Sequence, residues 1–66
     1  MLAIGKRVQS GPGEVLILDV KKDYLVLAMV GDSKFIIARG YEYENGRLYW
    51  AQGEYYDNLD NLIANL

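Results

Sequence analysis

The dipeptide Asn45-Gly46 restricts the fold of this chain more than any other feature. A two-residue type I′ turn requires positive φ at both central positions, and Asn followed by Gly tolerates that conformation best. Because runs rich in aromatic and β-branched residues flank the turn, the sequence predicts a hairpin of strands 35–44 and 47–55. The turn also fixes the pairing. The expected pairs are Glu44 with Arg47, Tyr43 with Leu48, Tyr41 with Trp50, Arg39 with Gln52, and Ala38 with Gly53.

Further strands are expected before the hairpin. Apolar runs of strand length cover residues 15–20, 24–30 and 34–43, with polar turn residues between them. These runs predict an antiparallel meander. Leu2, Ile4 and Val8 predict an edge strand ahead of the turn at 10–13, and a short helical turn is the alternative there.

The hydrophobic period changes at the end of the chain. Leu59, Leu62, Ile63 and Leu66 follow the spacing of a helix stripe, which predicts a helix over 58–65 with Asp57 as its N-cap. A helix this short is unstable alone, so it must pack on the sheet. The helix is expected to pack on a low patch of the sheet surface, where the side chains are small: Ala38, Gly40, Ala51 and Gly53. The predicted fold is α+β: one domain over 1–66, with a four- to five-stranded antiparallel meander sheet and one short C-terminal helix.

Both faces of this sheet carry apolar residues. If every turn is tight, one face holds Val15, Ile17, Asp19, Tyr24, Val26, Ala28, Phe35, Ile37, Arg39, Tyr41, Tyr43, Leu48, Trp50, Gln52 and Glu54. The other face holds Leu16, Leu18, Val20, Leu25, Leu27, Met29, Ile36, Ala38, Gly40, Tyr49, Ala51 and Gly53. One short helix does not cover both faces. Two solutions remain open: the sheet curls into a small barrel, or a second copy or a partner protein covers the aromatic face.

The composition argues against an enzyme and against a cofactor or metal site. The chain has no His, Cys or Thr, and its only serines, Ser10 and Ser33, lie in predicted turns without a neighbouring base. Its acidic residues lack the spacing of a calcium loop, and its glycines form neither a P-loop nor a dinucleotide fingerprint. The polar row Asp19, Tyr24, Arg39 and Gln52 is better explained by a salt bridge with cation–π packing than by catalysis.

Charge and aromatic content favour a protein-binding role. The formal net charge is −2, and residues 41–66 carry one cation, Arg47, against five carboxylates. Aromatic residues on a sheet also stack bases, but the surrounding acidity argues against nucleic-acid binding. In the protein-binding reading, Tyr41, Tyr43 and Trp50 are apolar anchors. The residues expected to steer a basic partner toward them are Glu42, Glu44 and Glu54.

Two segments of the second half carry a resemblance. Residues 35–41 (FIIARGY), residues 50–56 (WAQGEYY) and the acid-started helix resemble small uncharacterised accessory proteins of phages and conjugative elements of Gram-positive bacteria. This resemblance implies a non-enzymatic accessory protein of a mobile element. Since such elements carry small acidic proteins that block host defences, it also implies an anti-CRISPR-like inhibitor that occludes a defence nuclease.

Two other functions stay open beside this one. A small β-domain could bind single-stranded nucleic acid through the same aromatics, with Lys21, Lys22, Lys34 and Arg39 on the phosphates, or the chain could be a structural self-assembling subunit. A chain of this length buries little surface, so a homodimer is expected. The absence of Cys, of a signal-peptide hydrophobic region and of a membrane-length apolar run predicts a cytoplasmic location without membrane contact.

Overall fold

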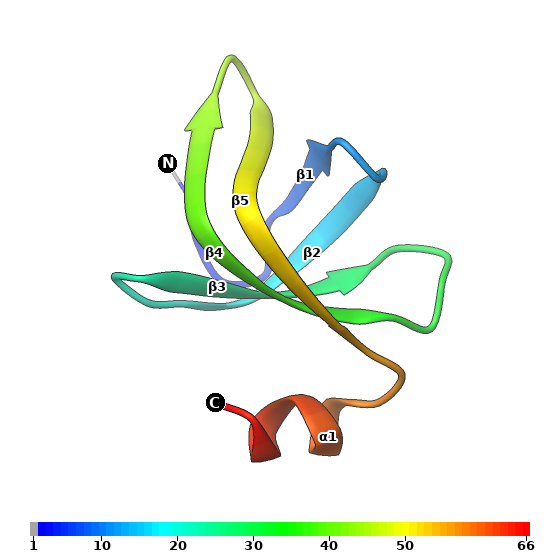
Figure 1. Ribbon diagram of the computed structural model, residues 1–66. Helices are drawn as coiled ribbons and strands as arrows, with labels where there is room; N and C mark the ends of the chain where they lie inside the picture. The colour runs from blue at the N-terminus through cyan, green and yellow to red at the C-terminus, as the bar shows by residue number, and fades with distance from the viewer. Residues whose placement is uncertain (1) are drawn as a thin grey trace.

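A computed structural model describes residues 2–66, which form a five-stranded barrel and one helix (Figure 1). The elements are β1 (Arg7–Ser10), β2 (Glu14–Val20), β3 (Tyr24–Met29), β4 (Phe35–Glu44), β5 (Arg47–Tyr56) and α1 (Leu59–Ala64). The strands follow one another around the barrel, and each successive pair is antiparallel. With an odd number of strands, the closing pair of β1 and β5 is parallel. The predicted α+β meander is confirmed, and of the two open solutions the sheet adopts the barrel.

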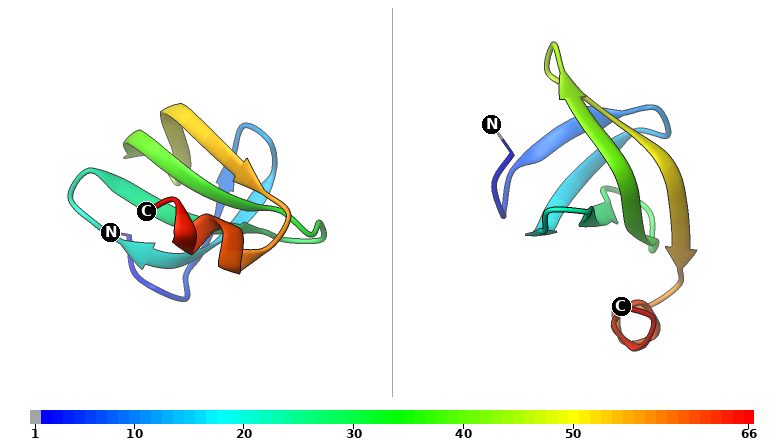
Figure 2. Two further views of the ribbon diagram at one scale, coloured as in Figure 1. Left: turned by 60° about the horizontal axis from the view of Figure 1, so that its bottom comes forward. Right: turned by 60° about the vertical axis from the view of Figure 1, so that its left-hand side comes forward.

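The predicted hairpin is confirmed in its turn and its register. Asn45 and Gly46 have φ values of 53° and 76°, as a type I′ turn requires. All five pairs expected across the turn are present, from Glu44 with Arg47 to Ala38 with Gly53. This long, strongly bent hairpin of β4 and β5 supplies one side of the barrel (Figures 1 and 2).

Two local irregularities exchange the predicted sheet faces. The β2–β3 register shifts between Ile17 and Asp19, so Val15 and Ile17 lie in the barrel core, not on the face of Val26. In β4, Gly40 has φ of 65°, and the buried Ala38 before it and Tyr41 after it both contribute to the same core. The assignment of Val15, Ile17, Tyr41, Tyr43, Leu48 and Trp50 to the face of Val26 and Ile37 is therefore wrong. These side chains fill or border the barrel interior with Val8, Leu25, Leu27, Ile36 and Ala38.

The helix packs on the outside of the barrel (Figure 2). Its buried residue, Leu62, contacts Val26 and Ile37 on the outer face of β3 and β4. The predicted seat on the low patch is wrong, because Ala38 of that patch faces the filled interior. The N-cap is Asn58, whose side-chain Oδ1 accepts a hydrogen bond of 2.8 Å from the amide of Asn61. Asp57, the predicted cap, lies one residue earlier.

The N-terminal strand is present but shorter than expected. Val8 belongs to β1 and is buried, whereas Leu2 and Ile4 precede the strand. Leu2 packs against the barrel core, and Ile4 is exposed. The Ser10 hydroxyl is buried and donates to the carbonyl of Gly13 at 2.6 Å, which holds the turn that follows β1. Within residues 2–66, α1 is too short to cross a membrane.

Candidate functional site

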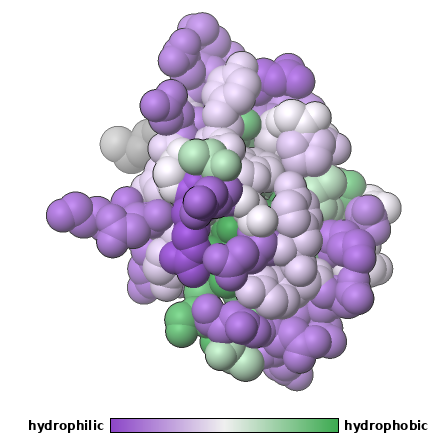
Figure 3. Space-filling view, viewed as in Figure 1, coloured by the Kyte–Doolittle hydropathy of each residue, from purple (hydrophilic) through white to green (hydrophobic). Residues whose placement is uncertain are grey.

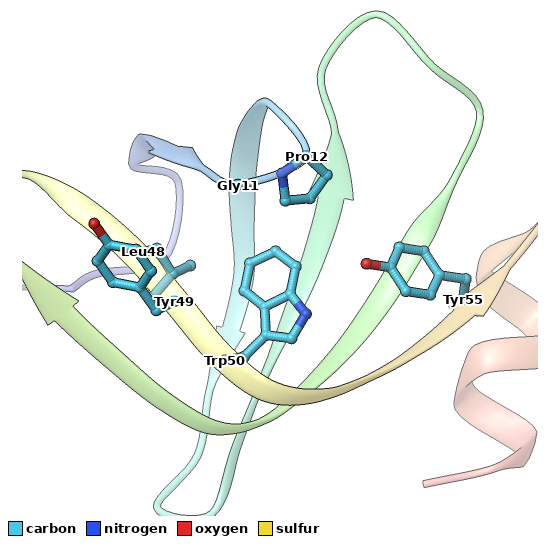
Figure 4. Close-up of a pocket in the computed structure, with 6 residues that line it drawn as sticks. All are labelled: Gly11, Pro12, Leu48, Tyr49, Trp50 and Tyr55. Carbon is cyan, nitrogen blue, oxygen red and sulfur yellow. The ribbon is translucent and has the colours of Figure 1, made fainter.

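A pocket of about 160 Å³ opens where the turn after β1 meets the second strand of the hairpin (Figure 4). Three of its lining residues are aromatic: Tyr49, Trp50 and Tyr55, all from β5. Gly11 and Pro12 of the β1–β2 turn and Leu48 of β5 complete it. The pocket exists because β1 pairs with β5 only at Gln9–Arg47 and Ser10–Leu48. Beyond Ser10 the chain turns away, while β5 continues.

The aromatic rings of the pocket are accessible to solvent. Tyr49 and Tyr55 are 51% and 53% exposed, which is high for side chains whose rings stabilise a fold mainly when they are buried. Trp50 is partly buried, with one side packed on the barrel core. The pocket therefore combines a ring fixed by the core with two rings that cover little of the protein itself.

Two polar atoms of the pocket have no partner within residues 2–66. Neither the indole N–H of Trp50 nor the hydroxyl of Tyr55 makes a hydrogen bond there, and both face the space between the two rings (Figure 4). The indole nitrogen remains accessible to water, because no buried side-chain polar atom of the described chain is left unpaired. Tyr41 and Tyr56 differ: their hydroxyls donate to the Lys21 carbonyl and to Glu54 Oε1, each at 2.9 Å.

Gly53 makes the approach of these rings possible. A Cβ at this position would lie 2.8 Å from Trp50 Nε1 and 3.0 Å from Tyr55 Cε1, closer than ordinary van der Waals contact. The glycine sits opposite the buried Ala38 in the hairpin register. A side chain here would displace Trp50, Tyr55 or both, so the absence of a Cβ shapes the pocket.

The structure separates the six residues predicted to bind protein. Tyr41 and Tyr43 are partly buried against the barrel core and do not line the pocket, so their role as anchors stays a prediction. Lys6 Nζ also lies 5.0 Å from the centre of the Tyr43 ring. Trp50 is the predicted anchor that lines the pocket. Glu42 and Glu44 are exposed on the outer part of the hairpin.

Glu54, the sixth predicted residue, belongs to a small polar cluster. Its carboxylate accepts hydrogen bonds from Arg39 Nε at 3.0 Å and from the Tyr56 hydroxyl at 2.9 Å. These two bonds, that from Arg39 first, lower the pKa of Glu54 below its usual range. Partial desolvation, followed by the bond to Glu54, raises the pKa of Tyr56. Glu54 therefore neutralises Arg39 rather than presenting a free charge.

The expected polar row is present in part. Arg39 lies opposite both Tyr24 and Gln52, and its guanidinium carbon is 5.6 Å from the centre of the Tyr24 ring. Asp19 lies opposite Val26 and 3.7 Å from Lys21. The salt bridge with cation–π packing expected for this row therefore forms, but Glu54 provides its carboxylate.

Three of the four cations invoked for phosphate binding are paired with carboxylates. Lys21 Nζ lies 3.7 Å from Asp19. Arg39 binds Glu54, and Lys34 Nζ bonds to Asp57, which raises the pKa of Lys34. Exposed pairs of this kind add little stability but do reduce the local positive potential. Within residues 2–66, no group of three acidic side chains is arranged to hold a metal ion.

Sequence reasoning found Trp50 but missed Tyr49, Tyr55 and Pro12. Tyr49 lies between Leu48 and Trp50, which both contact the barrel core, so its predicted place on the opposite face of β5 agrees with the structure, but its part in the pocket was not predicted. The triplet Gly53-Glu54-Tyr55 held the usable signal, since a glycine inside a strand marks a position where other groups approach the backbone closely.

Comparison of the chain with protein-family models, curated proteins and solved structures finds no match.

Proposed function

We propose that this protein is a non-enzymatic protein-binding module whose contact site is the pocket of Tyr49, Trp50, Tyr55 and Pro12. The observation that carries the proposal is the pair of unpartnered donors, Trp50 Nε1 and the Tyr55 hydroxyl, facing one apolar space. Sites that bind peptides and small groups are concave and largely apolar, with few oriented polar atoms. Tyr and Trp are also the residues enriched at interface hot spots.

The carboxylates of the hairpin support a role in steering. Glu42 lies directly opposite Tyr49, and neither Glu42 nor Glu44 forms an ion pair within residues 2–66. Unpaired surface charge raises the rate at which an oppositely charged partner arrives. The proposed partner is therefore a protein with a basic surface next to an apolar side chain.

Binding of nucleic acid is the less supported alternative. Base stacking fits exposed tyrosines, but phosphate binding needs free cations, and both Arg39 and Lys34 are engaged by carboxylates. Titration with a labelled oligonucleotide at low salt separates the two functions. We expect no saturable binding, whereas salt-sensitive binding through Tyr49 and Tyr55 would replace the protein-binding proposal.

The biological setting is a further part of the proposal. A mobile-element accessory protein in the cytoplasm, acting on a host defence nuclease, is supported by the resemblance of residues 35–41 and 50–56 alone. Nuclease assays with the pure protein test it. Inhibition that disappears on Tyr55→Ala would support a defence target, and full cleavage at saturating protein would remove that target.

A homodimer remains a prediction, and it is supported by the helix. Leu59, Ile63 and Leu66 of its apolar stripe are exposed, and Figure 3 shows apolar surface at the lower end of the molecule, where α1 lies. Light scattering tests this. We expect twice the chain mass for the natural chain and the single-chain mass for Ile63→Ser, whereas a monomer at all concentrations would contradict the dimer.

The pocket itself is tested by paired variants of exposed residues. Peptides selected from a displayed random library against the full chain serve as probes. Tyr55→Ala and Gly53→Ala should each weaken probe binding at least tenfold, since one removes a wall and the other displaces two rings. Lys22→Ala is the control, because this exposed residue of the β2–β3 turn is not part of the pocket. Equal binding by all three variants would contradict a site at this pocket.

A further inference from the structure

Most of β5 has a strand neighbour on one side only. β4 pairs with it from Arg47 to Tyr56, but β1 pairs with it only at Arg47 and Leu48. No other strand of residues 2–66 pairs with positions 49–56 of β5. A strand edge with unpaired main-chain groups is a template for another extended segment. The far half of β5 is thus an open edge in an otherwise closed barrel.

The hairpin register shows which main-chain groups face this edge. A two-residue turn makes Glu44 and Arg47 a hydrogen-bonded pair, and such pairs alternate along antiparallel strands. Near the turn, odd-numbered residues of β5 therefore direct N–H and C=O toward β4. The alternation reverses at Gly40: the bond from the Met29 amide to the Lys34 carbonyl makes Ile36 and Ala38 face β3. Ile37 and Arg39 therefore face β5, where they meet the main-chain groups of Glu54 and Gln52. Leu48 faces β1, in agreement with its pairing to Ser10. The groups on the open edge belong to Trp50, Gly53 and Tyr55.

The aromatic pocket lies along the same edge. Its walls come from β5 and from the turn at Gly11-Pro12, where β1 leaves β5 (Figure 4). A segment added to the open edge would continue the line of β1 past Ser10 and cross the pocket. Alternate side chains of an added strand face the same way, so one of them would enter the space between Trp50 and Tyr55.

Charge next to this edge indicates the composition of the added segment. Glu42 lies opposite Tyr49, and Glu14 follows the turn that carries Pro12. Neither carboxylate forms an ion pair within residues 2–66. We propose that the open edge of β5 takes up an extended segment of a partner protein as an added strand. Lysine or arginine flanks an apolar side chain of that segment, which fills the pocket. This inference rests on the proposed function and adds the mode of binding.

The main-chain hydrogen bonds are tested with N-methylated probes. Each library-selected peptide is synthesised in two forms, N-methylated at alternate residues in one register or in the other. We expect one form to bind about a hundredfold more weakly, since up to three main-chain bonds are lost, and the other to bind within about twofold of the parent. If both forms bind equally, the strand-addition mode is wrong while the pocket site stands. If the library yields no binder, both proposals are wrong.

A variant of the protein tests the same bonds from the other side. Tyr55→Pro removes an N–H that faces the open edge, where proline is tolerated, and Tyr55→Ala is the control that also loses the ring but keeps the N–H. Tyr55→Pro should keep the fold, by circular dichroism, and weaken the probes at least fivefold beyond Tyr55→Ala. Equal binding by Tyr55→Ala and folded Tyr55→Pro would overturn strand addition. A dimer of the natural chain that Tyr55→Pro dissociates, but Tyr55→Ala does not, would instead assign the edge to a second copy and would also overturn it.

Discussion

The role expected for Glu54 differs from the contacts that the residue makes in the structure. Its place beside an aromatic hairpin suggested a steering charge, yet in the structure its carboxylate is held by Arg39 and Tyr56. The residue type and position were predictable from the sequence, but the partner was not. Arg39 was expected to use Asp19, and the bulge in β2 sets the pairing of that strand. Pairing across a sheet decides which exposed charges remain free.

The Glu54 cluster predicts an acid-dependent contribution to stability. Because the folded pKa of Glu54 is lowered, the contribution is present above the carboxyl's usual pKa and is lost as the pH falls through the folded value. Glu54→Gln should therefore lower the urea midpoint at pH 7 but approach the natural protein at pH 3. Urea unfolding followed by Trp50 fluorescence measures both. Glu44→Gln, which removes an exposed and unpaired carboxylate, is the control, and a gap for Glu54→Gln that is equal at both pH values would contradict the assignment.

At the level of strands and helix, the sequence predicted element types well and faces poorly. The type I′ turn, the meander order and the strand lengths follow from turn chemistry and hydrophobic period, which act locally. The faces depend on two positions where the alternation breaks, Leu18 at the register shift and Gly40 at positive φ. A single shift reverses every side chain beyond it. The aromatic residues could therefore be recognised from the sequence, but their positions around one pocket could not.

Gly40 is expected to tolerate a side chain poorly. Its φ of 65° is unfavourable for an L-residue, and a Cβ would lie 3.1 Å from the Cβ of Ala51. Gly40→Ala should cost about 1–2 kcal/mol in the free energy of unfolding, measured by urea titration. Gly11→Ala, with an unhindered Cβ, should cost much less. Equal losses in the two variants would show that Gly40 does not control the bend.

The N-cap of α1 can be tested by comparing variants of Asn58 and Asp57. Asn58 caps α1 through the bond to the Asn61 amide, whereas Asp57 points to Lys34. Asn58→Ala should therefore destabilise the protein by about 1 kcal/mol, and Asn58→Asp should restore most of that loss. Asp57→Ala should have a smaller effect, because it removes only an exposed ion pair. A larger loss for Asp57→Ala in thermal unfolding would return the cap to Asp57.

As a domain, the chain closes a small barrel and leaves the opening in its wall lined by aromatic rings. Apolar residues from all five strands fill the interior, and Leu62 of α1 covers part of the outer surface. Closure ends where β1 turns away at Ser10, which exposes both the pocket and the free edge of β5. The site is thus a consequence of a first strand that is shorter than the last.

The fluorescence of Trp50 tests the proposed site, because this residue is the single tryptophan of the chain and forms the floor of the pocket. The natural protein is titrated with a library-selected peptide while emission and acrylamide quenching are recorded. We predict a saturable shift in Trp50 emission with reduced quenching in the natural protein and in Lys22→Ala, and little change in Tyr55→Ala. Saturable binding, by an independent measurement, that leaves Trp50 emission and quenching unchanged would contradict a protein-binding site at this pocket.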